Sequence, residues 1–382
     1  MSQHDRFDAA PPALATLDAF GLDALLAGAA RLRASRVGLA WSGEGVAPGA
    51  LTYGEWDGAA TLAAGALAAC GFEPGERALI VGAADPSTLC LLFGAVRAGL
   101  DVALCPAGEP AARIAERARA VAASVILAPG RIGAASVVAE VAQAAALCEQ
   151  VRLAAVWGEA GEPHDGVLPL HEVEPAPLGR RAVKGAIFTF ADDPGQPTRH
   201  RQDRLAAAAF DVIHRARLGP LAPILTTLAP MRHAGLVAGP LAALAAGASL
   251  HLHAPYDPAA LDAALRAAGR AVLIAPAELG EGFAVRADAP ALAGVAMLRE
   301  ARSGAPAPIR PGVPALDLWR WGETALAAEP RDIEGRPAPC PPEPHRFPLD
   351  ADEVTAIEWR RTSEGWELRG AACAQGDVWA KI

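Results

Sequence analysis

Short apolar runs alternate with longer helix-forming stretches through most of this 382-residue chain, and this alternation constrains the fold more than any other feature. In the first half it predicts strands and helices in strict succession: strands at 77–83, 101–106, 124–129 and 153–159, and helices at 87–99, 109–123 and 134–150. Apolar strands of this length joined by helices are typical of βαβ units. We therefore expect a mostly parallel sheet that is covered on both faces.

The alternation pauses over the polar, Gly- and Pro-rich residues 159–182, which predict a surface crossing between two subdomains, and then it resumes. The second half predicts strands at 185–190, 223–230, 249–255 and 271–276, and helices at 201–217, 236–247 and 258–269. After Arg299 the chain is proline-rich and then alternates as antiparallel strands do. The predicted fold is α/β, with two consecutive α/β subdomains (1–175 and 176–300) and a small β-rich part (301–382).

Composition narrows the functional classes. Apolar residues make up 52% of the chain and the formal net charge is −9, which indicates a folded protein without a nucleic-acid surface. Six cysteines without a CxxC pair argue against a zinc site or a disulfide framework. The N-terminus lacks the apolar core of a signal peptide, and the most apolar stretch, 235–250, is shorter than the roughly 20 residues of a membrane span. We expect a cytoplasmic protein with no membrane span.

Several segments, in their order and spacing, resemble the adenylate-forming acyl-CoA synthetase (AMP-binding) family. Residues 51–106, "LTYGEWDGAATL…DVALCP", look like that family's opening hairpin, helix and first βαβ unit. Residues 229–253, "APMRHAGLVAGPLAALAAGASLHLH", resemble the segment with a histidine at the acyl pocket, which is His233 here. "REARSGAPAP" (299–308) and "WRWGETALAA" (319–328) stand where the family binds adenine, which makes Ser303 and Gly304 candidate ligand contacts.

The resemblance implies ATP-dependent activation of a carboxylate, and that chemistry needs a flexible loop whose N–H groups and lysine hold the β- and γ-phosphates. Residues 190–199 read F-A-D-D-P-G-Q-P-T-R where the family has T-S-G-T-T-G-R-P-K-G. Gly195 is kept, but Asp192 and Asp193 bring negative charge and Thr198 replaces the lysine. Arg199 offsets part of that charge. We expect a degenerate phosphate loop; Asp-Asp-Pro-Gly is also good turn chemistry, and a plain turn is favoured over a repurposed cation or ligand loop.

The second adenine motif also departs from the family. Its aromatic-Gly-x-Thr-Glu pattern appears as Trp321-Gly322-Glu323-Thr324-Ala325, so alanine stands where the family's magnesium-binding glutamate belongs. Trp321, Gly322 and Thr324 are candidate ligand contacts; Trp321 as a packed core or rim aromatic is an equal alternative. Glu323 is one position early, and on a strand its side chain points to the opposite face. ATP and Mg²⁺ are therefore not expected, no cofactor is assigned, and AMP or an acyl-adenylate-like ligand stays a candidate.

The remaining candidate residues are weaker indications of a functional site. His251 and His253 alternate on a predicted strand and face one side, and packing is favoured over metal binding. His233 is equally well explained as a hydrogen-bonded core histidine. Residues 42–49, "SGEGVAPG", favour a hairpin loop over a dinucleotide fingerprint. Lys184 and Lys381 match no catalytic position of the family, and we assign no catalytic residue and no metal ligand.

The leading hypothesis is a degenerate relative of the acyl-CoA synthetases that binds a small carboxylate or adenylate-like ligand or regulates a partner. The resemblance implies a mobile C-terminal domain, which the sequence is expected to lack, so a homo-oligomer or a partner protein is expected at the face it leaves. Two alternatives remain: an active ligase with an unusual phosphate loop and a C-terminal domain supplied by another chain, and a structural subunit of a synthetase complex.

Overall fold

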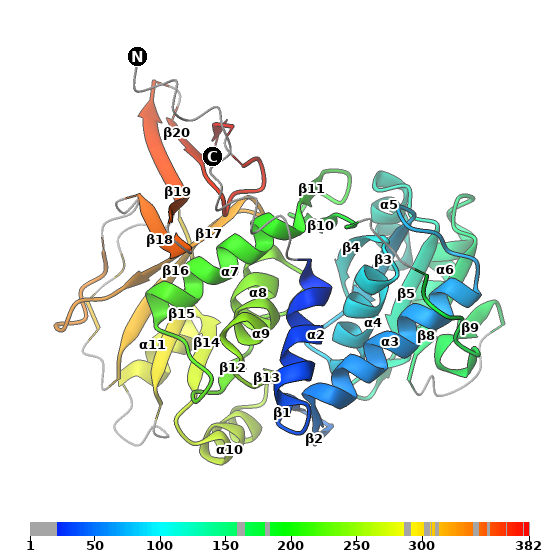
Figure 1. Ribbon diagram of the computed structural model, residues 1–382, viewed down its shortest axis with the longest axis horizontal. Helices are drawn as coiled ribbons and strands as arrows, with labels where there is room; N and C mark the ends of the chain where they lie inside the picture. The colour runs from blue at the N-terminus through cyan, green and yellow to red at the C-terminus, as the bar shows by residue number, and fades with distance from the viewer. Residues whose placement is uncertain are drawn as a thin grey trace.

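Two α/β lobes lie side by side, and a small antiparallel sheet from the end of the chain projects from one of them (Figure 1). The computed structural model describes residues 21–158, 165–179, 184–285, 292–301, 306, 308–309, 313–338, 344–349, 352–363, 365–376 and 378–381. The predicted fold class, mostly parallel α/β sheets with a small β-rich C-terminal part, is confirmed. No helix in the described part of the chain is long and apolar enough to cross a membrane.

The first lobe is built on a seven-stranded sheet in the order β11-β10-β4-β3-β5-β8-β9. Its pairs are parallel except for the hairpin β10–β11. The strands are β3 (Arg77–Gly82), β4 (Asp101–Pro106), β5 (Val125–Pro129), β8 (Leu153–Trp157), β9 (Val167–Pro169), β10 (Ile187–Phe190) and β11 (Pro197–His200). A small hairpin, β6 (Arg131–Ile132) and β7 (Ala135–Ser136), and a 3₁₀ turn, η2 (Leu170–Glu172), complete the connections.

Helices cover both faces of this sheet, as its apolar strands require. They are α3 (Tyr53–Ala69), α4 (Pro86–Arg97), α5 (Ala111–Ala120) and α6 (Val138–Ala146). Alternate residues of β3 separate the two faces: Ile80 packs in the core shared with α3 and α4, and Leu79 packs in the core shared with α5 and α6. α3 begins with a capping box, in which Thr52 and Glu55 satisfy each other's backbone N–H groups.

The second lobe has an eight-stranded sheet in the order β17-β16-β15-β14-β12-β13-β1-β2, parallel except at its two ends. The strands are β1 (Val37–Gly43), β2 (Val46–Thr52), β12 (Ile224–Thr226), β13 (Leu250–His253), β14 (Val272–Pro276), β15 (Gly294–Glu300), β16 (Ala315–Trp321) and β17 (Ala325–Pro330). β1 and β2 form the hairpin predicted around residues 42–49. The helices are α2 (Leu22–Arg33), α7 (Gln202–Ala216), α8 (His233–Leu236), α9 (Ala242–Ala246), α10 (Pro258–Ala268) and α11 (Ala277–Val285).

Sequence order and sheet membership interleave. Residues 37–52 lie in the second lobe's sheet although they precede the first lobe's strands, and residues 187–200 lie in the first lobe's sheet although they follow the predicted crossing. The predicted domain boundaries (1–175, 176–300 and 301–382) therefore do not coincide with the membership of the sheets. They remain a prediction about folding units.

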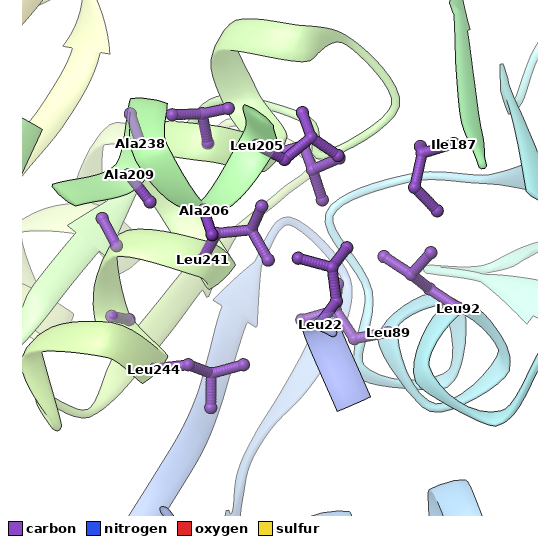
Figure 2. Close-up of a cluster of buried hydrophobic side chains, with 14 of the residues drawn as sticks. Leu22, Leu89, Leu92, Ile187, Leu205, Ala206, Ala209, Ala238, Leu241 and Leu244 are labelled. Carbon is purple, nitrogen blue, oxygen red and sulfur yellow. The ribbon is translucent and has the colours of Figure 1, made fainter. Parts of the chain in front are cut away.

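A continuous apolar core joins the two lobes. Figure 2 shows its side chains meeting where α2, α4, β10, α7 and the α8–α9 segment converge. The labelled residues are Leu22, Leu89, Leu92, Ile187, Leu205, Ala206, Ala209, Ala238, Leu241 and Leu244. Since burial of apolar side chains is the dominant favourable term in folding, this shared core holds the lobes in one arrangement.

The helix predicted at 236–247 begins earlier, at His233, and contains a π-helical stretch, η3 (Val237–Leu241), between α8 and α9. Pro240 lies inside η3 and has no N–H to donate, which accounts for the departure from α-helical hydrogen bonding. The earlier start places His233 at the first turn of this helical segment.

A four-stranded antiparallel sheet closes the chain, in the order β18-β19-β20-β21. Its strands are β18 (His345–Leu349), β19 (Asp352–Thr362), β20 (Gly365–Arg369) and β21 (Ala380–Lys381). β18 and β19 pack against α7 of the second lobe.

Candidate functional site

The segment that the sequence predicts to be a degenerate phosphate loop is the tip of the β10–β11 hairpin. Phe190 pairs with Pro197 across the hairpin, so residues 191–196 form the connection. The side chains of Asp192 and Asp193 lie at the surface, and that of Asp192 is fully exposed. The guanidinium of Arg113, on α5, donates to the carbonyl oxygen of Asp192 at 2.6 Å and anchors the loop to the first lobe.

The carboxylate of Asp193 forms hydrogen bonds within the loop. Its Oδ1 accepts from the backbone N–H of Gly195 at 2.8 Å, and its Oδ2 accepts from the side-chain amide of Gln196 at 2.7 Å. A side chain that accepts from the N–H two residues further on forms an Asx-turn. The loop's donors thus bind the loop's own carboxylate, in keeping with the turn chemistry of Asp-Asp-Pro-Gly.

Arg232 joins the loop to the second lobe, and the sequence analysis missed it. Its Nη1 donates to the carbonyl oxygen of Phe190 at 2.6 Å and its Nη2 to Oδ1 of Asp192 at 3.2 Å. Nη1 also lies 3.3 Å from Oε1 of Glu323, whose side chain is almost completely buried. One guanidinium therefore connects the end of β10, the loop and the turn before β17. The sequence feature that could have pointed to Arg232 is its position directly before His233.

Glu323 corrects an expectation. It lies in the turn between β16 and β17 rather than on a strand, so the argument from strand faces does not apply. Its Oε2 accepts from the backbone N–H of His233 at 2.7 Å, at the first residue of α8. The carboxylate thereby satisfies a donor that the start of a helix leaves without a partner, and it fixes the turn against the helix.

His233 is completely buried and stacks on His200, with ring centroids 4.9 Å apart and an angle of 11° between the rings. Burial lowers the pKa of His233 to about 4, so its imidazole is neutral at pH 7. Nε2 of His200 lies 2.8 Å from Oγ1 of Thr189. Within the described residues, Nδ1 of each ring has no hydrogen-bond partner. His200 is the last residue of β11, so the two neutral rings join the hairpin to the first turn of α8. The sequence analysis did not identify His200.

Trp321 is buried and stacks on Trp359 of β19, with centroids 5.5 Å apart. This contact corresponds to the core-aromatic alternative; a role as a ligand platform remains a prediction. Gly322, at φ +53°, forms the turn, and Thr324 donates its N–H to the carbonyl of Trp321 at 2.9 Å. Ala325 is fully buried at the start of β17.

The other candidates lie apart from this group. Ser303 and Gly304 are outside the described residues. Thr198 is half-buried on β11, and Arg199 lines a separate cavity at the opposite end of the hairpin. Arg199 is therefore not the residue that offsets the loop's charge; Arg232 is. Among the described residues, no group of three or more His, Cys, Asp or Glu side chains is arranged to hold a metal ion.

His251 and His253 face one side of β13, as expected. Oγ of Ser42, on β1, lies 2.8 Å from Nε2 of His251 and 2.9 Å from Nδ1 of His253. The backbone N–H of Asp257 donates to Nε2 of His253 at 3.2 Å. These bonds give both histidines a polar packing role.

Comparisons with known proteins agree with this architecture. Residues 30–189 match the family model described as AMP-binding enzyme. No curated protein matches the sequence. Among solved structures, the apo form of Mycobacterium smegmatis MbtA is 20% identical with a TM-score of 0.69, and the match covers 92% of this chain and 67% of that one.

Two further structures give the same result. A benzoate CoA ligase from Burkholderia xenovorans LB400 is 18% identical with a TM-score of 0.69, over 93% of this chain and 72% of that one. Acetoacetyl-CoA synthetase from Streptomyces lividans is 16% identical with a TM-score of 0.70, over 91% of this chain and 57% of that one. The resemblance to adenylate-forming, AMP-binding enzymes is confirmed: the chain carries their family match over residues 30–189 and has the fold of the N-terminal domain of such ligases.

Proposed function

We propose that this chain binds a small carboxylate or adenylate-like ligand beside Arg232 and does not form an acyl-adenylate from ATP. The observation that carries the proposal is the hydrogen bonding of the loop: Asp193 already holds the N–H of Gly195 and the amide of Gln196. A triphosphate would have to displace this carboxylate to reach the donors that a phosphate loop offers.

Charge supports the same conclusion. Asp192 and Asp193 each repel a phosphate at 4 Å by about 1 to 4 kcal/mol, depending on the effective dielectric. The position of the family's lysine is Thr198, and the position of its magnesium-binding glutamate is the buried alanine Ala325. The residues present do not fit ATP with Mg²⁺. Mg²⁺ is usually bound by carboxylate oxygens, but alanine stands at the position of the family's glutamate, and the carboxylates of Asp192 and Asp193 are already engaged by Arg232 and by Gly195 and Gln196.

Arg232 supports binding of a smaller anion. Its guanidinium is partly exposed, and of its two carboxylate partners only Glu323 is buried. Since ion pairs with a fully exposed partner contribute little, a ligand carboxylate or a single phosphate can replace Asp192 at modest cost. The planar fork of arginine suits either group.

A thermal-shift panel of AMP, acyl-AMP analogues, and aromatic and fatty acids tests the proposal. A ligand present at about 100 times its dissociation constant stabilises the protein by about 2.7 kcal/mol, and we expect at least one member to raise the melting temperature. Arg232→Gln should abolish that rise, whereas Arg266→Gln, on the exposed face of α10, should keep it. A panel without any shift, or a shift that survives Arg232→Gln, contradicts the proposal.

The same proposal includes a role in regulating a partner. It also includes assembly of the chain as a homo-oligomer or with a partner protein. They require a measurement of assembly state in solution.

A further inference from the structure

The amino ends of four neighbouring strands form one edge of the second lobe's sheet. Across these parallel strands, one row of paired residues joins Leu39 of β1, Leu250 of β13, Ile224 of β12 and Val272 of β14. Since neighbouring strands lie about 4.8 Å apart, the residues that precede this row lie side by side along the edge. Figure 1 shows α2 running down to it. Arg232 follows the carboxyl end of β12, so the edge is at the opposite end of that strand from the candidate ligand site.

Four arginines gather at this edge, and three of them are fully exposed. Arg36 stands directly before β1, and its Nη2 donates to the carbonyl oxygen of Pro220, before β12, at 3.0 Å. Arg217 stands directly after α7, three residues before Pro220. Arg270 precedes Val272 of the row by two residues. Three exposed guanidinium groups therefore come from three segments that meet at the edge.

Arg33, in the last turn of α2, completes the group. Its guanidinium lies against Gly247, before β13, so closely that a Cβ atom on this glycine would collide with it. The buried hydroxyl of Tyr53 donates to the carbonyl of Ala248 at 2.7 Å. Burial raises the pKa of Tyr53, and the charges of Arg33 and Arg36 partly oppose that rise. Both guanidinium groups therefore lie near the start of β13.

The edge carries positive charge in an acidic protein. Within the residues that the structure describes, none of the four arginines forms an ion pair with a carboxylate. The carboxylate of Glu55 lies near the edge, because the N–H of Tyr53 donates to the carbonyl of Arg36, but it is held by the N–H and hydroxyl of Thr52. Four positive charges and one negative charge leave +3, against −9 for the whole chain. Such a surface attracts an anionic partner.

Exposed leucines stand among the arginines. Leu221, next to the proline that binds Arg36, is 90% exposed, and Leu32, next to Arg33, is 77% exposed. A single exposed leucine is ordinary, but arginine and leucine together are typical of surfaces that lie in the membrane interface. The centre of a protein–protein interface is instead enriched in aromatic side chains, and none of the exposed side chains named here is aromatic.

We propose that this edge binds the surface of an anionic lipid bilayer. The arginines contact the lipid headgroups, and Leu221 and Leu32 enter the boundary between headgroups and acyl chains. A lipid surface adapts to the protein, so cations from several separate segments can all contact it without a matching groove. The proposal does not depend on the ligand proposed at Arg232.

Flotation with vesicles of phosphatidylcholine and phosphatidylglycerol in equal parts tests the proposal, and vesicles of phosphatidylcholine alone are the reference. We expect binding to the anionic vesicles only, with release in about 1 M NaCl, where the Debye length falls to about 3 Å. Arg36→Gln and Arg270→Gln should each weaken the partition coefficient about fivefold, because one arginine near an anionic surface contributes about that factor.

Arg131→Gln is the matched control for charge. Arg131 is exposed in the first lobe and donates to the carbonyl of Ala134 at 2.7 Å, much as Arg36 donates to a carbonyl, and its loss should leave binding unchanged. Leu221→Ser should weaken binding, whereas Ile333→Ser, at a side chain that is 95% exposed after β17, should not. The unfolding midpoint of each variant verifies that it is folded.

Absence of binding to the anionic vesicles overturns the proposal. So does equal binding to both kinds of vesicle, equal weakening by Arg131→Gln, or binding that is unchanged in both Arg36→Gln and Arg270→Gln. Two further results would overturn it and assign the edge to a protein: binding of polyglutamate without binding of vesicles, or self-association without vesicle binding that is lost in Arg270→Gln.

Discussion

Glu323 illustrates how the position of one residue changes the role of a carboxylate. In the sequence it stands one position before the family's magnesium-binding glutamate, and in the structure it is buried against the first turn of α8. There it accepts from the N–H of His233 and pairs with Arg232. With these two contacts the carboxylate holds the β16–β17 turn against the start of α8, and its oxygens are not available to a metal ion.

Glu323→Ala should lower the free energy of unfolding by about 1–3 kcal/mol, because it leaves a buried N–H without an acceptor. Glu334→Ala is a matched control at an exposed ion pair with Arg336 and should change it by no more than about 0.5 kcal/mol. Urea denaturation monitored by circular dichroism measures both. A loss for Glu323→Ala as small as that of the control would contradict the role assigned to this residue.

A buried charged group ties the C-terminal sheet to the second lobe. His345, the first residue of β18, lies between Asp211 of α7, at 2.9 Å from its Nδ1, and Glu329 of β17, which contacts its Nε2. Burial alone lowers the pKa of His345, but the two carboxylates more than offset this and raise it to about 9. The folded protein therefore holds a charged imidazolium at this junction.

The sign of the pH dependence follows from that raised pKa. The stabilisation is complete below the ordinary pKa of about 6.5 and is lost as the pH rises through the folded-state pKa of about 9. Wild-type unfolding free energy should thus fall between pH 6.5 and pH 9.5, with a smaller fall in His345→Gln. His214→Gln, at an exposed histidine of α7, should keep the wild-type profile. Parallel profiles for wild type and His345→Gln would refute the assignment.

The elements themselves were predictable because their signals are local. Most strands and helices of both halves, and the hairpin at 42–49, follow from apolar periodicity and turn chemistry. The helices α2 and α11 and the strand β15 were not predicted. The contacts that build the site join residues far apart in the chain: Arg232 with Glu323, His200 with His233, and Asp211 with His345. No periodicity encodes such pairs. The sequence therefore predicted that the loop was altered but not that Asp193 fills it and Arg232 holds it.

The two lobes share one core, and the candidate site lies where they meet. The hairpin with the loop comes from the first lobe, and Arg232, His233 and Glu323 come from the second. This arrangement keeps the framework of an adenylate-forming ligase while its charged groups bind one another. We propose that the chemistry of the loop, and not the framework, prevents adenylation.

Carboxylate-dependent exchange of labelled pyrophosphate into ATP tests this claim most directly. Adenylation needs preorganised donors for the leaving pyrophosphate, and losing one such donor costs about 10²- to 10³-fold in rate. With several altered, the natural protein should give no exchange with short, medium, long-chain or aromatic acids in the presence of Mg²⁺. The repaired protein, in which residues 190–199 become Thr-Ser-Gly-Thr-Thr-Gly-Arg-Pro-Lys-Gly and Ala325→Glu is added, should gain ATP binding. Because Ala325 is fully buried, circular dichroism first verifies that the repaired protein is folded. Robust exchange by the natural protein, or a folded repaired protein that still fails to bind ATP, would contradict the account.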